Sequence, residues 1–89
     1  MTDKKFERAF RTVIDVFAEV GSNIDDRNQL IDFGALSEDD ALFIGSRIRS
    51  YRYTIDDDVF RRLRDEGSVM TVASFAVTLA GTDDTEGNA

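Results

Sequence analysis

Residues 69–80 place the strongest constraint on the fold, because this stretch of the chain contains no charged side chain. It is too short to cross a membrane, which takes about 20 apolar residues, so it must be buried in protein. Its apolar residues mostly alternate, as in a strand, whereas its polar residues recur at three- and four-residue spacing, as in a helix. We predict a helix buried in the core, with a strand as the alternative.

The clearest helix is predicted over residues 4–20. Gly21 follows this segment and is suited to ending it. A short second helix is predicted over about 24–33, with Gly34 as a left-handed stop; a loop is the alternative there. The apolar side chains of the first segment recur every three or four residues and form one broad stripe, made of Phe6, Ala9, Phe10, Val13, Phe17 and Val20.

Ser37 and Thr54 are predicted to begin two further helices that share one charge pattern. Ser37 stands three residues before Asp40, and Thr54 stands three before Asp57, which is the spacing of a capping box. Acidic residues fill the first turn of each segment and arginines follow, as the helix dipole favours. Gly67 is predicted to end the second of these helices.

These segments predict an all-α fold, a small bundle of four to five short helices. Residues 1–81 form the single domain of this prediction. Residues 82–89 have no apolar run and carry three acidic side chains, so we predict a disordered acidic tail. A strand over 69–80 would make the fold α+β instead.

The absence of cysteine and histidine restricts the chemistry that this chain can perform. Disulfides, thiol nucleophiles and cysteine zinc sites are excluded, and so are the commonest general base and the commonest transition-metal ligand. We predict no enzymatic activity, no metal and no cofactor. A small domain without disulfides fits a reducing cytoplasm, in the producing cell or in a host, and no membrane partner is expected.

The acidic side chains are predicted to contact a protein partner. The net charge is −7, and an acidic protein favours basic surfaces and disfavours nucleic acid. Adjacent carboxylates on a helix point about 100° apart, so they do not converge on one substrate, and helix capping explains many of them. The candidate partner-binding residues are Asp25, Asp26, Asp32, Asp56, Asp57 and Asp58.

One basic window, residues 46–53, stands against this acidic background. Arginines interleave there with tyrosines, a mixture that can contact phosphates and stack on bases. The same arginines also suit the end of a helix, where their stems cover apolar surface. The candidate residues are Arg47, Arg49, Tyr51, Arg52 and Tyr53. Because the chain as a whole is acidic, direct binding to nucleic acid is the least favoured of the three binding functions considered below.

In size and composition the chain resembles small phage or mobile-element proteins that act by binding, including inhibitors of host defence or transcription. The resemblance implies a small acidic inhibitor or adaptor that binds a basic surface of a nucleic-acid-processing partner, with nucleic-acid mimicry as the most specific form. One alternative is an assembly protein that self-associates as a homo-oligomer through residues 69–80. The other is a nucleic-acid binder that uses residues 47–53.

Overall fold

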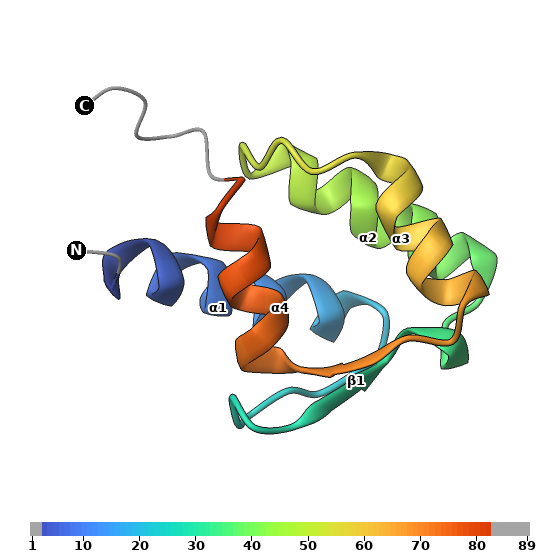
Figure 1. Ribbon diagram of the computed structural model, residues 1–89, viewed down its shortest axis with the longest axis horizontal. Helices are drawn as coiled ribbons and strands as arrows, with labels where there is room; N and C mark the ends of the chain where they lie inside the picture. Colours follow the sequence, from blue (N-terminus) through green and yellow to red (C-terminus); the bar gives the residue numbers. More distant parts are fainter. Residues whose placement is uncertain (1–2, 83–89) are drawn as a thin grey trace.

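The computed structural model describes residues 3–82, with the side chain of Asp57 excepted, as four α-helices, one 3-10 turn and a two-stranded sheet (Figure 1). The mainly helical class is confirmed, whereas the sheet makes the fold something other than a purely helical bundle. The elements are α1 (Asp3–Glu19), β1 (Leu30–Asp32), η1 (Phe33–Ala35), α2 (Glu38–Ser50), α3 (Asp57–Asp65), β2 (Val69–Thr71) and α4 (Val72–Ala80).

Helix α1 follows the apolar stripe of the sequence. Ala9, Val13, Val16 and Phe17 are buried in the core, and α1 packs along α4. Gly21 has a φ of 86°, a left-handed conformation that glycine adopts without steric cost. The prediction of this helix and of its end is confirmed.

The helix predicted over 24–33 is wrong, because this segment forms a loop followed by β1 and η1. Asp26 accepts a hydrogen bond from the amide of Asn28 at 2.9 Å, a local turn that competes with helix formation. The strand then pairs antiparallel with β2, with Ile31 opposite Met70. Gly34 does not adopt the predicted left-handed conformation. It lies in η1 instead, where its backbone is close to that of Gly67.

Residues 69–80 divide between the two predicted conformations. Residues 69–71 form β2, and α4 begins directly after them. Thr71 ends the strand and caps the helix, since its side chain accepts a hydrogen bond from the amide of Ser74 at 3.1 Å. The three- and four-residue spacing of the polar residues agrees with the helix. The apolar alternation did not mark the strand, because four of its five residues, Ala73, Phe75, Val77 and Leu79, lie in α4.

Helix α2 begins where the capping spacing predicted. The hydroxyl of Ser37 accepts a hydrogen bond from the amide of Asp40 at 3.1 Å. The first turn carries Glu38 and Asp39 beside Asp40, and arginines occupy the last turn. The hydrogen bond from Asp40 to Ser37 satisfies one of the first-turn amides that have no partner within the helix.

Replacing Ser37 with alanine is expected to lower the free energy of unfolding by about 1 kcal/mol, because the amide of Asp40 loses its acceptor. Urea denaturation followed by circular dichroism measures this loss. Ser46→Ala on the exposed face of α2 is the control, and it should change stability by less than about 0.5 kcal/mol. Equal stabilities of the two variants would show that the Ser37 cap is energetically silent.

The prediction that Thr54 caps the next helix is wrong. Asp56 is the N-cap of α3, and its side chain makes no capping hydrogen bond. Thr54 is engaged elsewhere: its amide and its hydroxyl both donate to the carbonyl oxygen of Thr82, at 2.9 and 3.2 Å. Thr82 therefore belongs with the folded part, and the rest of the predicted tail, 83–89, lies outside the described residues.

The core is built around the ring of Phe75 on α4. Three other buried rings pack edge-on against it, those of Phe17, Phe33 and Phe60, with centroid separations of 6.3, 5.4 and 5.8 Å. These partners come from α1, η1 and α3, so α4 connects the elements that surround it. Each such aromatic pair contributes about 0.5–1.5 kcal/mol beyond the burial of its surface.

Candidate functional site

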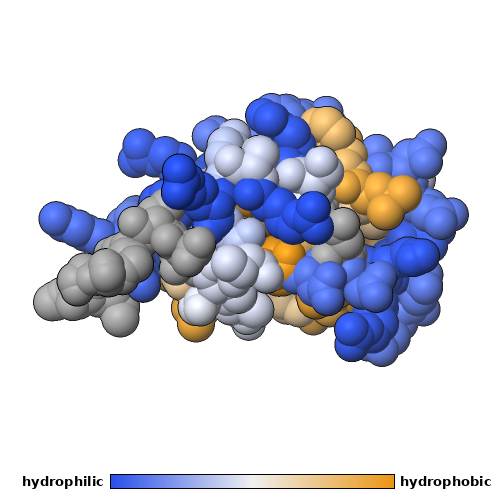
Figure 2. All heavy atoms as spheres, turned by 90° about the horizontal axis from the view of Figure 1, so that it is seen from above, coloured by the Kyte–Doolittle hydropathy of each residue, from blue (hydrophilic) through white to orange (hydrophobic). Residues whose placement is uncertain are grey.

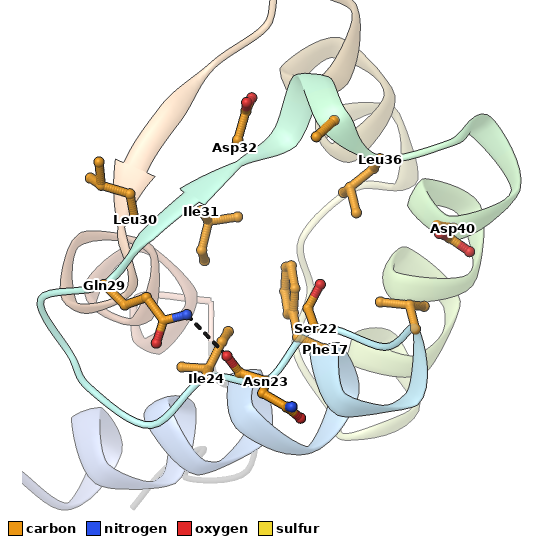
Figure 3. Close-up of a pocket in the computed structure, with 12 residues that line it drawn as sticks. Phe17, Ser22, Asn23, Ile24, Gln29, Leu30, Ile31, Asp32, Leu36 and Asp40 are labelled. Atoms are coloured by element: carbon orange, nitrogen blue, oxygen red, sulfur yellow. Dashed lines mark hydrogen bonds between the residues drawn. The ribbon is translucent and has the colours of Figure 1, made fainter.

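A hollow on the described surface runs along β1, and we call it the β1 groove. Its volume is about 390 Å³, within the usual range of ligand sites. Phe17, Leu36 and Ile31 point into it, and Asp40 stands across it from β1 (Figure 3). The loop that closes its lower side is held by Gln29, whose side-chain amide donates to the carbonyl oxygen of Asn23 at 3.0 Å.

The register of the sheet leaves one edge of β1 open. The amide of Phe33 donates to Ser68, and the amide of Val72 donates to Gln29, each at 2.9 Å, so the odd-numbered residues of this segment face β2. Successive residues of an antiparallel strand direct their backbone groups to opposite sides. The amides of Leu30 and Asp32 and the carbonyl of Leu30 therefore point away from β2, and no hydrogen bond within residues 3–82 uses them. The carbonyl of Asp32, the N-cap of η1, accepts the first hydrogen bond of that 3-10 turn.

The open edge borders the groove. Leu30, Ile31 and Asp32 all line the cavity, although their side chains alternate between the two faces of the sheet. Three consecutive residues can line one hollow only if it lies along the backbone edge of the strand. The groove thus combines an apolar floor with two free backbone amides, those of Leu30 and Asp32, and one free carbonyl, that of Leu30.

The outer face of the sheet is apolar as well as acidic. Leu30 is 63% exposed and Val69 is 53% exposed. Asp32 lies directly opposite Val69 in the register, and its carboxylate accepts a hydrogen bond from the amide of Gly34 at 3.0 Å. Asp32 and Asp40 are the charged residues that line the groove in the described part of the chain. Both of these charges are negative, and each attracts a cation.

The predicted acidic residues are not gathered into one row. Asp25 and Asp26 lie in the loop whose Arg27 carbonyl accepts from Ala73, at the start of α4. The segment that leads to Asp56 and Asp58 passes the other end of α4, where Thr54 meets Thr82. The structure therefore separates these groups along α4 (Figure 1). Of the predicted set, Asp32 alone lines the groove, and the side chain of Asp57 lies outside the described part.

The basic window does not form an aromatic and cationic surface. Tyr53 is only 2% exposed, so its ring cannot stack on a base, and Arg8 packs over it at 4.7 Å from the ring centroid. Arg47 binds Glu19 through two hydrogen bonds of 3.1 and 3.2 Å. The hydrogen bond and the charge of Glu19 raise the pKa of Arg47 above its usual value. Tyr51 is half-buried beneath Arg47, which leaves Arg49 and Arg52 exposed.

Two other surfaces carry weaker signals. The outer face of α3 presents Arg61 and Arg62 between Asp58 and Asp65, so its charges cancel. The face in Figure 2 is mostly hydrophilic, with a larger apolar area at its upper right and smaller ones near its centre and lower edge. Leu42 and Phe43 are the exposed large hydrophobic residues of α2. A patch of two apolar side chains is ordinary on a protein surface. Neither surface offers backbone groups to a ligand.

Helix α4 uses its apolar face within its own chain. Val72, Phe75, Ala76 and Leu79 are buried in the core, and Val77, which is 61% exposed, is the large hydrophobic residue that remains outside. One exposed valine on α4 is a small apolar contact area for self-association. The alternative that 69–80 joins two copies stays a prediction, and Val69 on β2, which is 53% exposed, is the other large hydrophobic residue of this segment that lies outside the core.

Comparison of the chain with protein-family models, curated proteins and solved structures gave no match. Within residues 3–82, no cluster of three or more acidic residues is placed to hold a metal ion. No described helix has the length and apolar character needed to span a membrane. What the protein binds must be inferred from the chemistry of its own residues.

Sequence reasoning missed the groove because it missed the sheet. The signal was present but short: buried Ile31 and Phe33 alternate with exposed Leu30 and Asp32. Leu30 is apolar although it faces outward, so the period of two was hidden. Asp40 was assigned to the helix start alone, and its place beside β1 follows only from tertiary packing.

Proposed function

We propose that this chain is a non-enzymatic protein-binding module that holds a basic surface of its partner against the β1 groove. The observation that carries the proposal is the composition of this groove, whose charged lining residues, Asp32 and Asp40, are both acidic. Apolar anchors and unpaired backbone groups adjoin them. A partner that supplies cations and apolar side chains would complement both the carboxylates and the apolar residues of the groove.

The same observation favours protein over nucleic acid as the partner. Two carboxylates at the groove repel phosphates, and the burial of Tyr53 removes a stacking platform from the basic window. Mimicry of nucleic acid calls for a continuous row of carboxylates near the phosphate spacing, and the described acidic groups lie at separate places. The module therefore acts as an adaptor or inhibitor that recognises a basic protein segment.

Removing the two groove charges is expected to weaken partner binding by about tenfold, because each carboxylate loses its attraction for a cation. The variant is Asp32→Asn with Asp40→Asn, and the amide that replaces the first carboxylate keeps an oxygen that can accept from Gly34. Tagged protein purified from its host at low and then high salt reports retention of the partner. The matched control is Asp15→Asn with Glu66→Gln, which removes the same charge from exposed sites outside the groove.

The comparison between these two variants decides the proposal. Loss of the same partner from the groove variant alone supports it, and release of that partner from wild type by salt shows the ionic component. Equal retention by both variants would overturn the assignment of the groove.

A further inference from the structure

We propose that the β1 groove takes up an extended, basic segment of the partner as a third strand beside β1. This inference rests on the proposed function and adds how the partner is held. Peptides that add a strand to an open sheet edge obtain affinity from main-chain hydrogen bonds and specificity from alternate side chains. The edge of β1 offers the main-chain hydrogen bonds, and the residues that line the groove contact the alternate side chains.

The backbone groups of Leu30 and Asp32 carry the first step. Both amides and the carbonyl of Leu30 point away from β2 and have no partner within residues 3–82, whereas the carbonyl of Asp32 belongs to the 3-10 turn η1. Their spacing matches that of a strand laid alongside, since alternate residues of one strand pair with alternate residues of the next. The cavity along this edge gives the added strand room.

The side chains define which segment fits. Residues of the added strand that face outward lie beside Leu30 and Asp32, where a lysine or arginine can cover Leu30 with its stem and place its charge near Asp32. Residues that face inward lie beside Ile31, above the apolar floor made by Phe17 and Leu36 (Figure 3). The matching pattern alternates basic and apolar residues.

Charge argues against a second copy as the occupant. Two copies paired through β1 around Ile31 would set each Asp32 beside a Leu30, with no cation to match it. Each chain carries a net charge of −7, so two copies repel at low ionic strength. A basic segment removes this repulsion and supplies the missing cations.

The probe is a synthetic peptide, acetyl-Lys-Val-Arg-Val-Lys-Val-Arg-amide, added to isotope-labelled full-length protein and followed by NMR. The amides of Leu30 and Asp32 are expected to shift and to exchange at least tenfold more slowly when the probe is bound. Two backbone-methylated forms of the probe test the main chain, one methylated at the amide nitrogens of the valines and one at the amide nitrogens of the basic residues. At least one of these forms should bind tenfold more weakly, because it cannot donate to β1.

Variants of Leu30 test the same step from the protein side. Leu30→Pro removes an amide that β2 does not use, and proline is tolerated where the lost amide faces away from the ladder. It is expected to bind the probe about tenfold more weakly than Leu30→Ala, which loses the side chain and keeps the amide. The methylated probes give the answer even if Leu30→Pro fails to fold.

The two proposals fail in different ways. If the probe loses affinity for the variant lacking both groove carboxylates but binds equally well when methylated and to Leu30→Pro, strand addition is overturned and the basic partner stands. If the variant lacking both groove carboxylates also keeps full affinity, both proposals fall. A dimer by sedimentation, with Leu30 and Asp32 amides protected before probe is added, would assign the edge to a second copy and overturn the inference.

Discussion

Replacing Phe75 with alanine is expected to remove a large part of the free energy of unfolding of this protein. The loss of a buried phenylalanine side chain costs about 3–5 kcal/mol through lost burial and the cavity that remains. The total stability of a domain of this size is roughly 4–13 kcal/mol. Phe75 also contacts three buried rings at centroid separations between 5.4 and 6.3 Å, so the cost should lie at the upper end.

Thermal and urea unfolding of Phe75→Ala measure this effect, and Val77→Ala is the matched control on the same helix. Val77 is 61% exposed, and its truncation should change stability by less than about 0.5 kcal/mol. Phe75→Leu should fall between the two, since it fills most of the space without the ring contacts. A loss below about 1 kcal/mol for Phe75→Ala would show that α4 does not pack as described.

Gly34→Ala is expected to be the most damaging addition of a single methyl group. A Cβ atom at this position would lie 2.9 Å from the Cα atom of Gly67 and 3.3 Å from a carboxylate oxygen of Asp32. The contacted Cα atom belongs to the backbone and cannot rotate away as the end of a side chain can. The turn η1 and the turn after α3 must therefore move apart. The residues beside these two glycines, Phe33 and Ser68, are joined by a backbone hydrogen bond of 2.9 Å at the end of the sheet. Moving the two turns apart would strain this hydrogen bond. We expect a loss of about 1–3 kcal/mol.

Two neighbouring substitutions separate contact from backbone conformation. Gly67 has a φ of 65°, and a Cβ atom there meets nothing within 4 Å, so Gly67→Ala should cost about 1–2 kcal/mol from the left-handed conformation alone. Ala35→Ser, at an exposed position beside Gly34, should cost less than about 0.5 kcal/mol. Urea denaturation ranks the three variants, and a Gly34→Ala as stable as Ala35→Ser would disprove the close approach.

Much of the helical part of this fold could be predicted because its signals are local. The stripe of α1 repeats along the length of the helix, and the cap of α2 needs only Ser37 and the amide of Asp40. Thr54 shows where such reasoning stops: its spacing suits a cap, yet Thr82 occupies both its amide and its hydroxyl. That competition comes from residues 28 positions apart in the chain, and no local pattern records it.

The candidate site was harder to predict for the same reason. Strand β1 has three residues, and its partner β2 lies at the other end of the sequence. The acidic residues were predicted from their charge alone, whereas the site depends on which carboxylates lie beside the open edge of β1. Asp32 belongs to both sets, and Asp40 joins it only because α2 folds back toward β1 (Figure 3).

The place of Phe75 late in the sequence also governs when this protein can fold during its synthesis. Phe17, Phe33 and Phe60 are made before α4, and each needs Phe75 to complete its packing. Until residues 72–80 leave the ribosome, the earlier helices expose these rings to water and to other nascent chains. The nascent chain therefore acquires its native structure only after almost all of the described residues have been translated.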